Sequence, residues 1–582
     1  MKALLVHSED SIASAANGSW QWVIDFGLAP ESTYRRWAAD LGCDVTSIYA
    51  FSGGMADVRE IQHVLQSGNG TLVDAHGLDW WDILSVLLAS NFQNLLLLMR
   101  LATRLHGRWQ LHATRPDALF TALAYLLESK IQVHRRQLGL REVRRYARVG
   151  SSLDLPQLRQ VVQDKFDPQH SIRRRFASRV RKSAVPAILL PSAYINVSRT
   201  AVNYATRVPD LDFLLVYGRK TSILNSLPAN VRAVTLDGYF TRTDRSEIAQ
   251  LDSVWKRLSE ALVRTRDEFS VANTAGMLDR MPALLRWGIA LRDAWLNVFA
   301  NEDITGCLCA DDSNPYSRVP LILAAKRNLP TVACHHGALD YRMAFKTHYS
   351  DHYLTKSEIE RDYLRRVCEV PPELLASAGQ PTGERRSVSG DRSTAVFFTE
   401  PYNAWGWRMD DVYRELIPGL LTMAQRCGLK LVLKLHPFES TRGHERMLKR
   451  LIPRSAVANI KIVAGPCSEE LWRSTRFAMT VQSTAALECA TRGIPVFLCT
   501  WLSDPYSGYA EQFAHFGIGH MLRSPEGMAR IPELLDRHSK DPVGKPVWDN
   551  LDSDKLRELL LGSAPKQRMP KLDAERAGAF AS

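Results

Sequence analysis

The sequence predicts an α/β protein with two doubly wound domains facing a cleft and a basic helical insertion in its N-terminal half. Short apolar runs alternate with longer stretches of helical periodicity along most of the chain. Such alternation is typical of parallel sheets, in which a crossover helix follows each strand. The chain has 582 residues, which is too many for one hydrophobic core, so we expect several domains.

Eight apolar runs in the first two thirds of the chain are predicted strands. They span residues 3–7, 45–49, 71–75, 187–191, 213–217, 231–236, 306–310 and 331–334. Their rhythm is interrupted by a helical stretch rich in arginine. We therefore expect an N-terminal α/β segment over 1–115, a basic helical segment over 116–185 and a second α/β domain over 186–380.

A polar, turn-rich stretch at residues 380–392, QPTGERRSVSGDR, predicts an interdomain linker. Strands predicted beyond it span residues 395–399, 431–435, 460–463, 477–481 and 496–499. Helical patterns separate most of them, so we expect a C-terminal doubly wound domain over 393–563. The remaining residues, 564–582, are charged and small and predict a flexible tail.

The amino-acid composition limits the kinds of partner and compartment that we expect for this protein. Hydrophobic residues make up 45% and charged residues 23%, as in ordinary globular proteins. The net charge of +12 favours anionic partners, which include phosphates, nucleic acid and an acidic membrane face. Nine dispersed cysteines without metal-binding spacing indicate a reducing, cytoplasmic compartment. The sequence shows neither a helix-turn-helix signal nor a base-stacking motif, so we expect no nucleic-acid partner.

Membrane insertion is not expected. The N-terminal apolar run is too short for the core of a signal peptide. The most apolar stretch, residues 84–101, is interrupted by polar side chains, and this predicts a buried helix rather than a span. Arginine clusters between residues 135 and 182 form solvated helix faces or, alternatively, dock on an anionic membrane. Localisation at the inner face of the cytoplasmic membrane is the corresponding prediction.

The first candidate binding motif is Lys434-Leu435-His436-Pro437, at the carboxyl end of a predicted strand. Ligands of open parallel sheets bind beyond these strand ends. Pro437 stops the strand and holds His436 at the rim, where its imidazole donates a hydrogen bond to a phosphate and, when protonated, adds charge. Alternatively, His436 merely satisfies a loop carbonyl.

The second motif runs from Ser483 to Glu488, where a strand gives way to a helix. Ser483 is a good N-cap, and the first-turn amides near Thr484 form an anion site. Glu488 lies one turn inside the helix, where its carboxylate could accept hydrogen bonds from the diol of a ribose. The alternative is an ordinary capped helix. Because this motif and His436 lie about 45 residues apart on two strand ends, we expect both to bind one nucleotide phosphate, without metal or other cofactor.

Two further strand ends supply candidate bases. His336 and Gly337 follow one strand, and His336 is a candidate general base or phosphate partner. The adjacent His335 suggests a metal pair, but neighbours in an extended segment point to opposite faces. Asp311 and Asp312 follow another strand as candidate bases or Mg²⁺ ligands. The alternatives are a structural turn histidine and, for the aspartates, a helix cap before Pro315.

Residues 300–520 resemble bacterial surface-polysaccharide transferases of the GT-B type. These include the capsule Kdo transferases, the bacterial polysialyltransferases and the CDP-glycerol glycerophosphotransferases of teichoic acid assembly. The segment ending in His436-Pro437 is similar to their His-Pro motif, whose histidine contacts the donor phosphate. Gln482-Ser483-Thr484 with Glu488 resembles their serine/threonine motif and the acidic residue after it.

The acceptor-side motifs resemble the same enzymes. His336-Gly337 is similar to the His-Gly element of the glycerophosphotransferases, in which the histidine is a proposed base. Asp311-Asp312 stands where some capsule and sialic acid enzymes carry paired acids. Ser313 follows where the polysialyltransferases normally have glycine, and Val481-Gln482 replaces an aspartate–tyrosine of the glycerophosphotransferases. Residues 1–185 match no motif.

The resemblance implies a metal-independent glycosyltransferase with two domains around a cleft. The C-terminal domain would bind a nucleotide sugar, with His436, Ser483 and Thr484 stabilising the departing phosphate, and the domain before it would bind a glycan or lipid-linked acceptor. The alternatives are a polyol-phosphate transferase with a CDP-activated donor and a non-catalytic nucleotide-binding scaffold. The donor sugar, the acceptor and the stereochemical outcome stay open.

Overall fold

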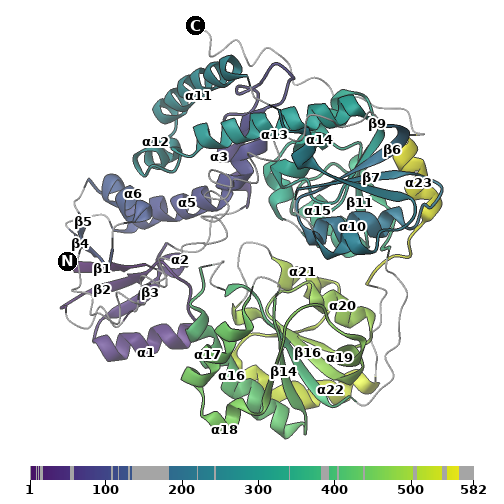
Figure 1. The fold of residues 1–582 in the computed structure, drawn as a ribbon. Coiled ribbons are helices and arrows are strands. Elements are labelled where there is room, and N and C mark those ends of the chain that lie inside the picture. Colours follow the sequence, from purple (N-terminus) through teal and green to yellow (C-terminus); the bar gives the residue numbers. More distant parts are fainter. Residues whose placement is uncertain are drawn as a thin grey trace.

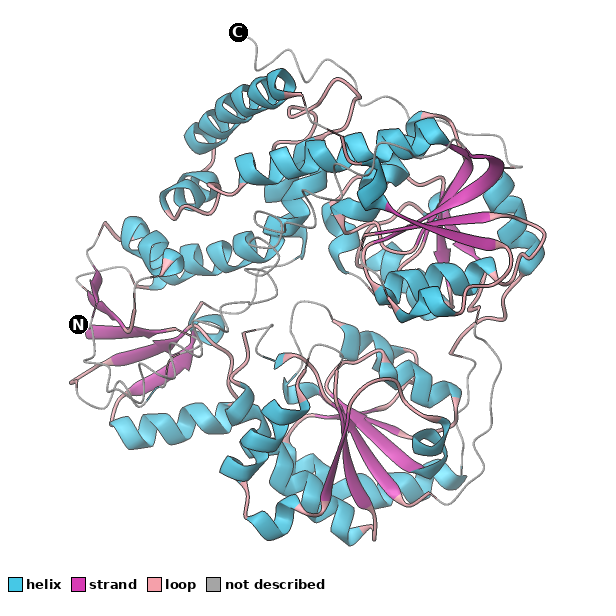
Figure 2. Ribbon diagram, viewed as in Figure 1, coloured by secondary structure: helices cyan, strands magenta, loops and turns pink. Residues whose placement is uncertain are grey.

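Three parallel sheets covered by helices make up the protein, which confirms the predicted α/β class (Figures 1 and 2). The computed structural model describes residues 2–7, 10, 12, 18–52, 58–105, 109–115, 117–128, 131–133, 183–218, 221–241, 244–337, 339, 341–381, 392–402, 406–436, 439–502, 508–540 and 547–562. All three sheets have the strand order of doubly wound folds, so each has a topological switch point at its centre.

The first sheet has the order β3-β2-β1-β4-β5. Its strands are β1 (Lys2–Val6), β2 (Trp22–Asp25), β3 (Asp44–Ser47), β4 (Gln110–Ala113) and β5 (Ile131–Val133). The helices of this region are α1 (Glu31–Leu41), α2 (Ile48–Phe51), α3 (Val58–Gln66), α4 (Trp80–Ser85), α5 (Ala89–Arg104) and α6 (Ala118–Leu126), with the 3-10 turn η2 (Val86–Leu88). The N-terminal α/β segment thus forms a sheet of its own.

One predicted strand of this region is wrong. Residues 71–75 form turns around Asp74, whose carboxylate accepts the backbone N–H groups of His76 and Leu78 and the indole N–H of Trp80. A buried carboxylate with three local donors organises a turn rather than a ladder. The strands β2, β4 and β5 were not predicted, because they are only four, four and three residues long and each contains a polar residue.

The second sheet has the order β12-β11-β10-β9-β6-β7-β8, with its switch point between β6 and β9. Its strands are β6 (Ser183–Ser192), β7 (Phe213–Tyr217), β8 (Val231–Thr235), β9 (Glu302–Cys309), β10 (Thr331–Ala333), β11 (His352–Thr355) and β12 (Leu375–Ser377). Its helices are α10 (Ile195–Ala205), α11 (Arg245–Thr265), α12 (Asp267–Thr274), α13 (Met281–Asn301), α14 (Pro315–Lys326) and α15 (Glu358–Arg366), with the 3-10 turns η3 (Ser222–Asn225), η4 (Leu236–Tyr239), η5 (Tyr341–Phe345) and η6 (Pro372–Leu374).

The third sheet has the order β15-β14-β13-β16-β17-β18, with its switch point between β13 and β16. Its strands are β13 (Thr394–Phe398), β14 (Lys430–Lys434), β15 (Ile460–Val463), β16 (Thr475–Thr480), β17 (Val496–Cys499) and β18 (His520–Leu522). The helices are α16 (Met409–Arg426), α17 (Thr441–Leu451), α18 (Arg454–Val457), α19 (Glu469–Ser474), α20 (Ala485–Thr491), α21 (Tyr509–His515), α22 (Ile531–Lys540) and α23 (Ser553–Leu561), with the 3-10 turns η8 (Thr500–Leu502) and η9 (Pro525–Arg530).

The last helix leaves the third sheet and returns to the second. Figure 1 shows α23, in yellow, against the second sheet, where Leu556 and Leu560 enter the same apolar cluster as Ile188 and Leu308. The returning chain passes Gly379 so closely that a Cβ there would stand 2.2 Å from the carbonyl oxygen of Asn550. This crossing ties the second and third units together at the end of the chain.

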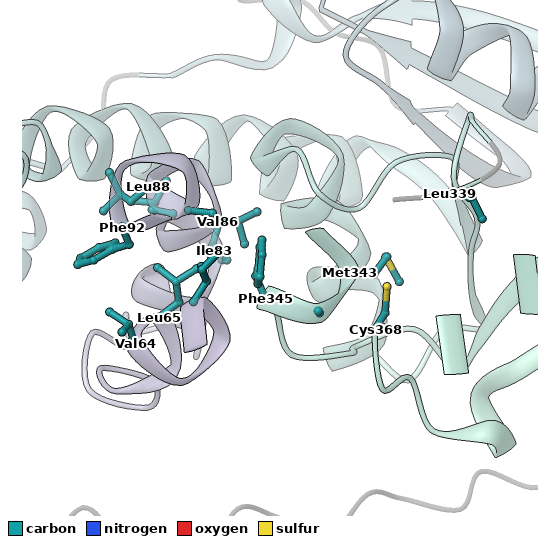
Figure 3. Close-up of a cluster of buried hydrophobic side chains, with 14 of the residues drawn as sticks. Val64, Leu65, Ile83, Val86, Leu88, Phe92, Leu339, Met343, Phe345 and Cys368 are labelled. Atoms are coloured by element: carbon teal, nitrogen blue, oxygen red, sulfur yellow. The ribbon is translucent and has the colours of Figure 1, made fainter. Parts of the chain in front are cut away.

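Helices of the N-terminal region share a core with the second unit. Figure 3 shows Phe345 of η5 against Ile83 and Val86, within one continuous apolar cluster. Beside it, the buried carboxylate of Asp82 pairs with the buried guanidinium of Arg318 and accepts the backbone N–H of Thr347 at 2.8 Å. These contacts hold the N-terminal region to the second unit.

Arg408 joins the first sheet to the third unit. Its guanidinium pairs with both oxygens of the fully buried Asp25, at 2.6 and 2.8 Å, and donates to the carbonyl of His7 at 3.0 Å. A backbone bridge between Leu28 and Trp407 continues the contact. The N-terminal region therefore contacts both of the other units.

Several predicted features fall outside the described residues. These are the basic clusters between 135 and 182, most of the predicted linker (382–391) and the tail (564–582). The described part of the predicted basic segment forms α6 and β5 before the gap, and β6 begins at Ser183. Among the described residues no single helix has the length and hydropathy of a membrane span, although Trp80–Leu88 and Asn91–Arg104 pass that test as a pair bent by 60°.

Candidate functional site

The carboxyl edges of the second and third sheets meet in the folded protein. A Cβ placed on Gly337, after β10, would lie 3.9 Å from the methyl carbon of Thr484, after β16. Nearby, the Tyr509 hydroxyl of α21 donates to the carbonyl of Leu339 at 3.0 Å. We call this meeting line, defined by Gly337, Leu339, Thr484 and Tyr509, the interdomain seam. The strand-end motifs of both sheets are therefore brought to one place.

On the third sheet, His436 follows β14 and its backbone is held firmly. Its N–H lies 3.1 Å from both Thr399 Oγ1 and Glu439 Oε2. Burial lowers the pKa of the imidazole, the Glu439 carboxylate raises it in opposition, and Lys434 lowers it further. Near pH 7 His436 is therefore neutral, and it would meet a phosphate as a hydrogen-bond donor rather than as a cation. Pro437 lies outside the described residues.

The turn before α20 is organised by Glu400, which follows β13. The buried Glu400 carboxylate accepts the Gln482 N–H at 2.8 Å and the Thr480 hydroxyl at 3.2 Å. Thr480 Oγ1 accepts the Ser483 N–H at 3.2 Å. The turn is thus fixed from the neighbouring strand end as well as from within.

Ser483 and Thr484 share the cap of α20. The N-cap residue is Thr484, whereas the Ser483 hydroxyl accepts the Ala485 N–H at 3.3 Å. Because the amides of Gln482, Ser483 and Ala485 have protein acceptors, an anion here would meet hydroxyls and the Thr484 amide rather than a full row of amides. His436 is on the same sheet edge, two strand spacings away, or roughly 10 Å.

Glu488 lies close to three basic side chains. Its side chain is exposed to solvent, yet dense surrounding protein raises the pKa of its carboxyl, while Arg492, Arg199 and Lys434 act to lower it. Arg199 belongs to α10 of the second unit, so positive charge reaches Glu488 from both sides of the interdomain seam. Lys434 itself is buried and donates from Nζ to the Leu435 carbonyl at 2.9 Å. A solvent-open acid among three cations suits an anionic ligand that also carries hydroxyl groups.

Asp311 and Asp312, which follow β9, differ in the side chains that contact their carboxylates. Asp312 is buried, with Lys346 Nζ at 2.5 Å and the Tyr353 hydroxyl at 2.9 Å. Burial would raise its pKa, but Lys346 and Arg318 outweigh that effect and the pKa of Asp312 is lowered. These contacts favour a structural role for Asp312 rather than that of a base.

Asp311 instead points toward the switch point between β6 and β9. It accepts the hydroxyl of Tyr194 at 2.7 Å and the Ser313 N–H at 3.0 Å. The same hydroxyl lies 3.3 Å from His336 Nδ1. Asp311 and His336 are thus brought together through a third residue, at the point where ligands of doubly wound sheets bind.

The His335–Gly337 turn rests on a buried ammonium group. Lys356 Nζ donates to the carbonyls of His335 and Gly337 at 2.6 and 2.7 Å, and to Glu360 Oε1 at 3.2 Å. Both Lys356 and Glu360 are almost completely buried. The backbone that carries His336 is therefore anchored from beneath by an ion pair of the second unit.

Several residues of this site were not predicted from the sequence, among them Tyr194, Glu400 and Lys356. Tyr194 and Glu400 follow predicted strands, so the strand-end rule that identified His436 would also have found them. Nothing local singles out Lys356. Among the residues that the structure describes, no three His, Cys, Asp or Glu side chains converge where they could hold a metal ion.

Comparison with known proteins shows only distant likenesses. No family profile and no curated protein matches the chain. Similar solved structures include the UDP-GlcNAc 2-epimerase of Methanocaldococcus jannaschii, at 10% identity over 65% of this chain and 99% of that one, with a TM-score of 0.42. The wall teichoic acid polymerase TagF is 12% identical over 69% of this chain and 90% of that one, with a TM-score of 0.36. The calicheamicin glycosyltransferase CalG4 is 13% identical over 69% of this chain and 98% of that one, with a TM-score of 0.33. Similarity at this level says nothing about substrate or reaction.

Proposed function

We propose that this protein is a glycosyltransferase that moves a sugar from a nucleotide-activated donor to a surface-polysaccharide or glycolipid acceptor. The observation that carries the proposal is the interdomain seam. It brings polar strand-end residues of one doubly wound sheet, around Ser483 and Thr484, to those of another, around His336. Two facing ligand edges suit a reaction that joins two substrates.

The third sheet would bind the donor. The neutral His436 imidazole and the hydroxyls of Ser483 and Thr484 would donate hydrogen bonds to the nucleotide phosphates. Glu488 would accept hydrogen bonds from the ribose diol. The cations around Glu488 make this part of the interdomain seam favourable for an anion. In this proposal the nucleotide sugar is a substrate, and neither a metal ion nor a resident cofactor takes part.

The second sheet would bind the acceptor, with His336 or Asp311 taking the proton of the attacking hydroxyl. Catalysis would come from aligning the two substrates and from stabilising the departing phosphate. Asp312 has no place in this scheme because Lys346 and Tyr353 already occupy its carboxylate. We also propose contact with an anionic membrane at the cytoplasmic face. The support for this contact is the arginine-rich clusters of the sequence between residues 135 and 182.

A thermal-shift screen against CMP, CDP, UDP and GDP tests the donor site. A nucleotide that binds the folded protein at a concentration of 100 times its Kd stabilises it by about 2.7 kcal/mol. We expect one nucleotide to raise the melting temperature, and the His436→Ala variant to lose both that shift and sugar transfer. His515→Ala, an exposed histidine on α21, is the matched control and should keep both. Full activity of His436→Ala would refute the phosphate role.

Donor hydrolysis measured across CMP-, CDP- and UDP-activated compounds identifies the reaction. Release of a nucleotide from an activated sugar supports the proposal. Release of CMP only from CDP-activated polyols would replace it with polyol-phosphate transfer, the reaction that the His336-Gly337 resemblance suggests. Tight nucleotide binding without turnover of any donor and acceptor would replace it with a non-catalytic scaffold.

A further inference from the structure

Glu439 holds the main chain of His436 at the end of β14. Its N–H donates to the His436 carbonyl at 3.0 Å, and its carboxylate oxygen Oε2 accepts the His436 N–H at 3.1 Å. The same oxygen accepts the hydroxyl of Thr399, which follows β13. Both backbone polar groups of His436 are therefore hydrogen-bonded to one residue, three positions further along the chain.

Buried groups of two helices lie behind this carboxylate. His444 of α17 places Nε2 3.4 Å from Glu439 Oε1, and the Tyr413 hydroxyl of α16 lies 3.1 Å from the same nitrogen. The side chains of Glu439 and His444 are only 6% and 2% exposed. The Glu439 carboxylate is therefore fixed between the core of the third unit and the edge of its sheet.

The negative charge of Glu439 makes its hold on His436 strong. A carboxylate only accepts hydrogen bonds, and bonds to a charged acceptor are stronger than bonds to a neutral one. Burying a carboxylate is costly unless it is hydrogen-bonded, and here the His436 N–H and the Thr399 hydroxyl both point to Oε2. The direction of these donors leaves the backbone of His436 little freedom.

We propose that Glu439 is a positioning residue of the donor site, whose carboxylate fixes the backbone of His436 and so presents the imidazole to the donor phosphate. This inference rests on the proposed function. His436 would touch the phosphate, whereas Glu439 would act through His436 without touching the substrate.

The test compares Glu439→Gln and Glu439→Ala with Glu445→Gln, which changes an exposed glutamate on α17. Glutamine keeps an oxygen that can accept the His436 N–H but has no charge, and alanine removes both. Calorimetric titration with CMP, CDP, UDP and GDP measures binding. For a nucleotide that binds the wild type, we expect Glu439→Ala to weaken the affinity on the order of tenfold, as for the loss of one hydrogen bond to a charged group. Glu439→Gln should recover part of this loss, and Glu445→Gln should bind like the wild type.

The titration of His436 supplies a measurement that a purely structural role would not change. Burial lowers the pKa of the imidazole, the negative charge of Glu439 raises it and Lys434 lowers it further. The ring proton signals of His436, assigned by their loss in His436→Gln, give this pKa by NMR without any nucleotide. We expect a lower pKa of His436 in Glu439→Gln than in the wild type, and an unchanged one in Glu445→Gln.

Thr399→Val is the second variant if Glu439→Ala does not fold. It removes the hydroxyl that contacts both Glu439 and the His436 N–H, so it should also weaken nucleotide binding. An equal pKa of His436 in the wild type and in Glu439→Gln, or full nucleotide affinity in Glu439→Ala, would overturn the role of Glu439. If none of the four nucleotides binds the wild type, the proposed function fails instead, and the pKa comparison still decides whether Glu439 controls His436.

Discussion

Replacing Lys356 with methionine should destabilise the second unit strongly. The ammonium group is buried and donates to two carbonyls of the His335–Gly337 turn and to Glu360, whose side chain is also buried. Methionine fills similar space but leaves the Glu360 carboxylate without its cation. Removing one partner of a buried ion pair typically costs about 3–5 kcal/mol, because the remaining charge stays desolvated.

Urea-induced unfolding, followed by intrinsic fluorescence, measures this loss. Lys555→Met is the matched control, because Lys555 and Glu558 also pair at 3.1 Å but have side chains that are 41% and 47% exposed. Exposed pairs contribute roughly 0.2–1 kcal/mol. If Lys356→Met costs no more than Lys555→Met, the anchoring role of the buried pair is wrong.

The pH dependence of the stability of Lys356→Met is a second test, and its direction follows from the pKa of Glu360. Burial raises the pKa of Glu360 above its value in the unfolded chain, and Lys356 opposes that rise. Without Lys356 the folded-state pKa rises further, so the folded variant binds more protons than the unfolded chain. Its stability should therefore increase as pH falls through that raised pKa. A deficit that grows toward acid pH would refute this reasoning, and Lys356→Met/Glu360→Gln should recover most of the loss.

Three further predictions concern other parts of the molecule. Arg408→Ala leaves the buried Asp25 without its cation, so we expect the N-terminal region to become sensitive to limited proteolysis, with a loss of about 3–5 kcal/mol. Gly379→Ala places a Cβ 2.2 Å from the carbonyl oxygen of Asn550 at a φ of +78°, so thermal melting should show a loss of at least about 1–3 kcal/mol. The lowered pKa of His436 makes it neutral near pH 7, so calorimetric nucleotide affinity should rise as pH falls through that pKa and the imidazole gains charge.

Each of these predictions has a control. Arg414→Ala removes an arginine whose side chain is 45% exposed and should leave proteolysis unchanged. Gly428→Ala also has a positive φ, +65°, but meets no atom within 4 Å, so it should cost only the backbone strain of about 1–2 kcal/mol. A His436→Gln variant should lack the acid-dependent gain in affinity. Equal effects of variant and control would contradict the corresponding contact.

The sequence predicted much of the second and third sheets. Strands such as β7 and β13 are continuous apolar runs, because parallel strands in these sheets are buried on both faces. The same rule failed in the first sheet, where β2 and β4 are only four residues long and each includes a polar residue, and where an apolar run became the turn around Asp74. Short strands carry too little periodicity to be distinguished from loops.

The residues that follow the strands could be interpreted from the sequence because the sheets are parallel. Because polar residues beyond parallel strands gather at one edge, His436 and Ser483 could be assigned to one edge of one sheet without coordinates. The predicted roles of these residues stay predictions. The cap of α15 is local in the same way, because the Ser357 hydroxyl accepts the N–H of Glu360, three residues later, at 3.5 Å. Lys356, next to it, carried no sign of its contact with the His336 turn.

The sequence by itself determined the α/β class and most strand ends of the second and third sheets, because these depend on local patterns of apolar and polar residues. Only the tertiary structure decided which strand ends face each other, that Asp312 is paired within the protein while Asp311 joins Tyr194, and that Arg408 reaches Asp25. Those contacts link residues more than a hundred positions apart in two of the cases and depend on complementary buried charge and shape. A local pattern records that a side chain is polar, but not which partner burial will give it.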